Sequence, residues 1–67
     1  MSKLFYVASD DGRAVYRSKS TKLLYVRNFG DIAPGMELCQ YKTKDKAQDL
    51  AMITAVNGWE GFSVKEL

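Results

Sequence analysis

The chain has 67 residues, of which 46% are hydrophobic and 27% are charged, and its formal net charge is +2. A chain of this length buries only a modest core, so we expect a single compact α+β domain over residues 1–67, without room for an enclosed active site. No apolar run approaches the roughly 20 residues needed to cross a bilayer, so we do not expect a membrane protein.

The residue types argue against catalysis. The chain has no histidine and one cysteine, Cys39, so the familiar zinc sites and the histidine-assisted nucleophiles of hydrolases lack their essential groups. Its acidic residues are scattered, and none lies in an apolar context that would raise its pKa. We therefore predict a non-enzyme without cofactor or metal. The lone cysteine, and an apolar run at residues 1–8 too short for a signal peptide, favour a cytoplasmic location.

The first part of the chain has the pattern of strands separated by turns. Residues 3–9 are rich in aromatic and β-branched side chains, and Asp11-Gly12 is a strong hairpin signal before a second strand at 14–18. Ser20-Thr21 marks a weaker turn before a third strand at 23–26. These segments predict an antiparallel meander of three strands.

Two-residue turns in both hairpins would determine which side chains share a face of the sheet. They place Tyr16 opposite Tyr25 and Val15 opposite Val26. One face then carries Leu4, Tyr6, Ala8, Val15, Arg17, Leu24 and Val26, and the other carries Phe5, Val7, Tyr16, Leu23, Tyr25, Arg27 and Phe29. Both faces are largely apolar. A single helix covers only one of them, so the other is expected to meet a partner or a second copy, unless strong twist, the 29–35 loop and Trp59 cover it.

The remainder predicts a fourth strand, a helix and a fifth strand. The loop at 29–35 contains the turn signal Pro34-Gly35, and the fourth strand is expected over 36–41. Thr43 is a suitable N-cap, and Asn57-Gly58 is a suitable end for the helix. A last strand is expected from Phe62 onward. The predicted order is β-β-β-β-α-β, with one helix packed on one face of an antiparallel sheet.

The predicted helix has an inner face of small and apolar residues at the three-and-four spacing of a helix: Ala47, Leu50, Ala51, Thr54 and Ala55. Met52, Ile53 and Val56 extend apolar character around it. We expect these three to be buried as part of a broader packing face, and the alternative is a groove-binding face. Trp59, just beyond the helix end, is expected to fold back onto the last turn, with a role as an interaction anchor as the alternative.

The order strand, Thr-x-Asp-x-Ala-x-x-Leu-Ala, Gly and Phe-x-Val from Tyr41 onward resembles the strand-helix-strand layout of several small phage-encoded proteins. Among these are an inhibitor of bacterial RNA polymerase and some inhibitors of CRISPR complexes. The shared positions are capping and packing residues, so no functional residue is carried over. The resemblance implies a compact, non-catalytic binder that blocks a large protein or nucleoprotein assembly.

Charge segregates clearly in one segment. Five basic residues and no acid lie between residues 13 and 27, interleaved with two tyrosines. The predicted contact residues are Tyr16, Arg17, Lys19, Lys22, Tyr25 and Arg27. The sequence favours a small binding protein that occupies the surface of a larger protein or nucleoprotein assembly. The alternatives are a basic-aromatic surface for DNA or RNA, and a solvated hairpin whose charges prevent edge pairing.

Overall fold

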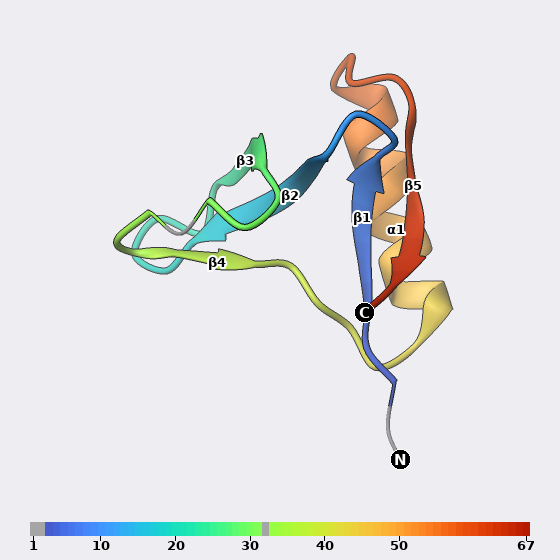
Figure 1. The fold of residues 1–67 in the computed structure, drawn as a ribbon, viewed down its shortest axis with the longest axis horizontal. Coiled ribbons are helices and arrows are strands. Elements are labelled where there is room, and N and C mark those ends of the chain that lie inside the picture. The colour runs from blue at the N-terminus through green and yellow to red at the C-terminus, as the bar shows by residue number, and fades with distance from the viewer. Residues whose placement is uncertain (1–2, 32) are drawn as a thin grey trace.

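The computed structural model describes residues 3–31 and 33–67. Its elements, in chain order, are β1 (Phe5–Ser9), β2 (Arg13–Ser18), β3 (Leu24–Asn28), β4 (Met36–Leu38), α1 (Lys44–Val56) and β5 (Phe62–Glu66). The predicted α+β fold is confirmed, since one helix accompanies a five-stranded antiparallel sheet (Figure 1). The first two residues of the N-terminal apolar run and residue 32 of the 29–35 loop lie outside the description.

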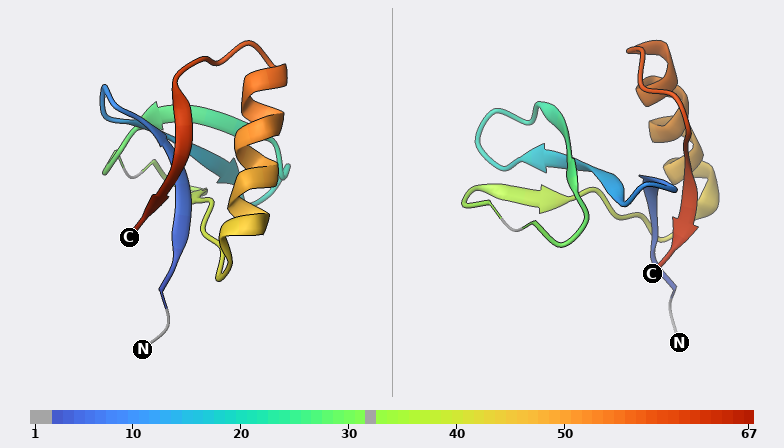
Figure 2. Two further views of the ribbon diagram at one scale, coloured as in Figure 1. Left: turned by 90° about the vertical axis from the view of Figure 1, so that its right-hand side faces the viewer. Right: turned by 45° about the horizontal axis from the view of Figure 1, so that its top comes forward.

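The sheet bends sharply at β2. One edge of β2 pairs with β3 along its whole length. The other edge pairs first with β1, through Ala8 and Ala14, and then with β4, through residues 16–18. Because Ala8 and Ala14 are small and buried, β1 and β2 can cross closely there. Figure 2 shows the result, in which β2 and β3 run across the direction of β1 and β5.

The helix covers β1 and β5. It begins after Thr43, whose hydroxyl oxygen accepts a hydrogen bond from the backbone N–H of Lys46 at 3.4 Å. It ends before Gly58, whose φ of 94° lies in the left-handed region that glycine adopts without steric cost. Both ends agree with the prediction. No helix of the described residues is long and apolar enough to cross a membrane.

Two apolar clusters lie on opposite faces of the bent sheet. The first faces α1 and contains Val7, Val15, Cys39, Leu50 and Ala51. The second has no helix over it and contains Ala8, Ala14 and Tyr16, with Tyr6, Met36 and Leu38 packed against them. The segment after β3 partly covers this second cluster, since Phe29 packs edge-on against Tyr6 and Gly30 donates a hydrogen bond to the Tyr16 hydroxyl at 3.0 Å. The chain therefore supplies some of the cover that the second face needs.

The predicted register of the first hairpin was wrong by one residue. Pairing of Ala8 with Ala14 leaves a three-residue loop, Asp10 to Gly12, instead of the two-residue turn. Gly12 has a φ of 91°, as expected of a hairpin in which a left-handed glycine follows a tight turn. The shift turns β1 over relative to β2, because side chains alternate between faces. Val15 therefore joins Val7 instead of Ala8.

The second hairpin has the predicted register but a wider connection. Tyr16 lies opposite Tyr25, and Val15 lies opposite Val26, as expected. β2 ends at Ser18 and β3 begins at Leu24, so the turn is longer than two residues. Within this turn, Lys22 has a φ of 65°. The fourth strand is shorter than predicted. After Leu38 the chain keeps one bond to β2, from the Cys39 N–H to the Val15 carbonyl at 3.2 Å, and then forms an isolated bridge between Tyr41 and Phe5.

Candidate functional site

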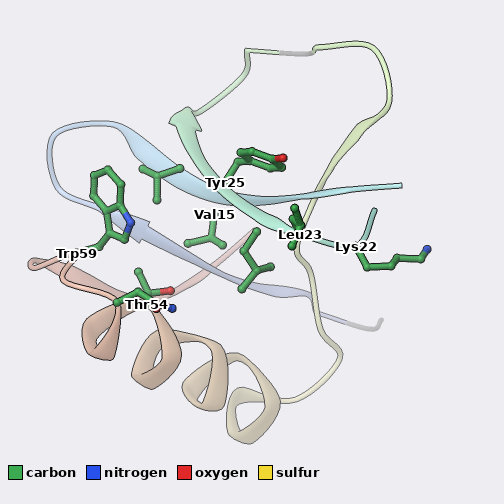
Figure 3. A pocket seen from close by; sticks show the side chains of 9 residues that line it. Val15, Lys22, Leu23, Tyr25, Thr54 and Trp59 are labelled. Atoms are coloured by element: carbon green, nitrogen blue, oxygen red, sulfur yellow. The ribbon is translucent and has the colours of Figure 1, made fainter. Parts of the chain in front are cut away.

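An open groove of about 630 Å³ lies between β3 and the C-terminal half of α1. Its centre is formed by apolar side chains of β2 and β3, and its second wall by the end of the helix. The lining residues are Val15, Lys22, Leu23, Leu24, Tyr25, Val26, Thr54, Asn57 and Trp59. In Figure 3, Trp59 stands at one end of the groove, and Lys22 and Leu23 stand at the other.

The bend of the sheet explains why this groove is open. The helix packs on β1 and β5, whereas β2 and β3 cross them at a steep angle (Figure 2). The side of α1 that faces β3 is therefore only partly covered by the sheet. Thr54 is buried and its hydroxyl donates to the Leu50 carbonyl at 2.8 Å, so it adds a methyl group and no free donor to the groove wall.

Trp59 is held in place at its end of the groove and still presents a large apolar surface. Its backbone N–H donates to the Thr54 carbonyl at 3.1 Å, which returns the chain onto the last helical turn as predicted. Its ring meets Phe62 edge-on at 6.3 Å between centroids, and the Arg13 guanidinium lies 5.6 Å from its centroid. The ring nevertheless remains 42% exposed. A positioned and accessible tryptophan is typical of an anchor at a binding surface.

Exposed apolar side chains continue from the groove onto the helix. Leu23 is 59% exposed at the rim. On α1, Ile53, Met52 and Val56 are 48%, 62% and 81% exposed, so the expectation that they are buried was wrong. The physical reason is that α1 packs through its stripe of small residues, and no second layer covers its outer side. Ile53 lies on the same side of the helix as the lining residue Asn57, four residues later.

The two tyrosines that were predicted to act together differ in their exposure to solvent. Tyr16 is only 6% exposed, and its hydroxyl accepts the Gly30 N–H. Tyr25, directly opposite in β3, is 43% exposed and also borders the groove. Tyr16 therefore packs in the interior, and of the pair only Tyr25 presents a broad surface.

The predicted basic residues do not form one free cationic face. Arg27 Nη2 lies 2.8 Å from Asp31 Oδ2, and Arg17 is opposite Glu37 in the pairing of β2 with β4. Lys19 and Lys22 are exposed in the connection between β2 and β3, and Lys22 borders the groove. Opposing carboxylates thus reduce the local field of the arginines, while the connection keeps a positive end.

Residues 3–31 and 33–67 contain two side chains with shifted pKa values, Cys39 and Asp11. No group of three or more acidic, cysteine or histidine residues in these ranges could hold a metal ion. Burial raises the pKa of the Cys39 thiol, which disfavours the reactive thiolate. The Ser9 hydroxyl and then the Arg13 guanidinium lower the pKa of Asp11, which is the opposite of what a general acid needs. Both pKa shifts have local structural causes, burial for Cys39 and hydrogen bonding for Asp11.

The groove itself was not predicted from the sequence. Its walls come from three segments, the start of β3, the end of α1 and Trp59, and only the bend of the sheet brings them together. One signal did point toward it, since Leu23-Leu24 interrupts the alternation of the third strand and Ile53 lies outside the inner helix stripe.

No protein-family model matches this chain, and neither the curated proteins nor the solved structures contain a match.

Proposed function

We propose that this chain is a small non-catalytic binding protein that occupies a surface of a larger protein or nucleoprotein assembly, through the groove between β3 and α1 and its rim. One observation carries the proposal. Leu23 and Trp59, which line a single groove, are large and exposed apolar side chains, and Ile53 on α1 is exposed next to the lining residue Thr54, in a chain of only 67 residues. Exposed apolar surface of this kind is costly in water and is typical of protein interfaces.

The apolar lining favours a protein surface over DNA or RNA. Contact with phosphates requires several unopposed cations on one face, and binding of single strands adds accessible aromatic rings. Arg13 lies 3.0 Å from Asp11, Arg27 pairs with Asp31, and Tyr16 is buried. The groove, by contrast, offers apolar contacts with a basic rim. This proposal extends to action as an inhibitor or regulator inside a bacterial cell, and its support is the resemblance to the phage-protein layout and the lone cysteine.

The test is an affinity capture from a bacterial lysate with and without nuclease, using two matched variants. Leu23→Asp places a charge on the apolar rim, and Lys19→Glu reverses a charge in the same connection. Both positions are exposed, so neither change is expected to unfold the chain. We expect a discrete, nuclease-resistant protein partner that Leu23→Asp loses and Lys19→Glu retains. Capture that disappears with nuclease and with Lys19→Glu would instead assign nucleic-acid binding.

A further inference from the structure

The edge of β3 that faces the groove has backbone groups that are not paired with another strand of the described residues. β3 pairs only with β2 in the described part of the chain. The ladder ends are set by the Ser18 N–H to Leu23 carbonyl bond and the Phe29 N–H to Gly12 carbonyl bond. Hydrogen-bonded pairs alternate along an antiparallel ladder, so the odd-numbered residues of β3 bond to β2. The N–H and carbonyl groups of Leu24 and Val26 therefore point away from β2, toward the open edge.

This open edge forms a wall of the groove. Three successive residues, Leu24, Tyr25 and Val26, border the groove, although successive side chains of a strand point to opposite faces. Figure 3 shows the Tyr25 ring on the side of β3 away from α1, whereas Val15 points toward the helix. The backbone at the edge of β3 therefore borders the groove, in addition to the side chains. An occupant here is offered a row of alternating donors and acceptors.

The charges at the groove select the occupant further. Lys22 stands at one end of the groove, whereas Arg13, which lies over the Trp59 ring at the other end, is paired with Asp11. The lining contains no acidic residue in the described ranges. A second copy of this chain, added through its own β3, would offer Lys22 no acidic partner from its own groove lining. An occupant with an acidic side chain is favoured instead.

Resting on the proposed function, we infer that the groove binds an extended segment of a partner protein, which adds to β3 as a further strand. Backbone hydrogen bonds to Leu24 and Val26 hold the segment. Its alternate apolar side chains lie beside the partly exposed Leu24 and Val26 on the side of β3 that faces α1, and one of its acidic residues faces Lys22. Strand addition at an exposed sheet edge, with alternate side chains in a neighbouring hydrophobic groove, is a general mode of peptide recognition.

The experiment selects binders for the wild-type protein from a displayed library of random octapeptides and measures the affinity of one chosen peptide by Trp59 fluorescence. We expect selected peptides to share apolar residues at every second position and an acidic residue. Amide hydrogen exchange, followed residue by residue by NMR, should slow at Leu24 and Val26 when the peptide binds. N-methylation of the peptide should abolish binding at alternate positions only, because only every second N–H of an added strand faces β3.

Two pairs of variants test the same geometry on the protein. Val26→Pro removes an outward N–H and adds a ring at the open edge while the bonds to β2 are kept, so it should weaken the peptide by about tenfold or more. Val26→Ala shortens the same side chain, keeps the N–H and should weaken it less. Lys22→Gln should weaken binding by about twofold to fivefold and lower its salt dependence, whereas Lys19→Gln should change neither. The N-methylation pattern does not depend on whether Val26→Pro folds.

The outcomes separate this inference from the proposed function. Failure to select any peptide, or protection confined to amides outside β3, would overturn strand addition. The apolar-surface proposal would still stand if Leu23→Asp lost the captured protein. Protection of Leu24 and Val26 without peptide, together with a concentration-dependent dimer in sedimentation, would overturn the inference in favour of a second copy. If Leu23→Asp captured the protein as well as the wild type does, the proposed function itself would be overturned.

Discussion

Replacement of Tyr16 by alanine should act mainly by destabilising the fold, and not by removing a contact with a partner. The Tyr16 ring is 6% exposed and packs with Ala8 and Ala14, while its hydroxyl accepts the Gly30 N–H at 3.0 Å. Truncation of a buried aromatic ring to alanine costs about 3–5 kcal/mol. A chain of 67 residues has a free energy of unfolding of roughly 3–10 kcal/mol, at about 0.05–0.15 kcal/mol per residue. Tyr16→Ala should therefore be marginally folded at best.

The conservative variant Tyr16→Phe separates the ring from the hydroxyl. It keeps the buried ring and removes only the acceptor for Gly30, whose loop remains close to water, so we expect a loss of about 1 kcal/mol. For a chain of this size, that loss lowers Tm by roughly 4–8 °C. Urea unfolding followed by circular dichroism measures both variants. An unchanged unfolding midpoint for Tyr16→Ala, combined with loss of the captured partner, would refute the burial of Tyr16 and restore it as a contact residue.

Three further predictions concern single groups. Because burial raises the pKa of Cys39, the folded protein resists deprotonation of this thiol, so its free energy of unfolding should fall as pH rises above about 9 in urea titrations, and Cys39→Ser should flatten this fall. The pKa of Asp11 should lie below its ordinary value in an NMR titration, and Ser9→Ala should raise this pKa. The lowered pKa contributes stability that is present above the unfolded-state pKa and is lost as pH falls through the folded-state pKa. Thr43→Ala removes the helix N-cap and should cost about 1 kcal/mol in thermal unfolding, whereas Thr43→Ser should be nearly neutral.

The helix and its ends could be predicted because their causes are local. The cap at Thr43, the left-handed residue Gly58 and the inner stripe that includes Leu50 act through neighbours within one or two turns. The structure agrees with these predictions except at Ala55, which was expected in the inner stripe and is exposed. The register of the second hairpin was also predicted correctly, since the pairing of Tyr16 with Tyr25 follows from the strand pattern on both sides of the turn.

The first hairpin shows how a small local choice changes the distribution of side chains. Asp11-Gly12 signals a turn equally well in a two-residue or a three-residue loop. The structure has the longer loop, in which Asp11 bonds to the Ser9 hydroxyl and to the Arg13 guanidinium. One extra loop residue moved Val15 to the face of Val7 and Tyr16 to the face of Ala8, and so decided that Tyr16 lies inside.

By itself, the sequence determined the order of the elements, the capped helix and the absence of histidine chemistry, because these depend on residue type and near neighbours. The tertiary structure alone decided where the groove lies. Close crossing at Ala8 and Ala14 directs β2 and β3 away from the helix, and this bend opens the groove beside Trp59. Such a bend depends on which strands share the two edges of β2, and those pairings join residues far apart in the chain.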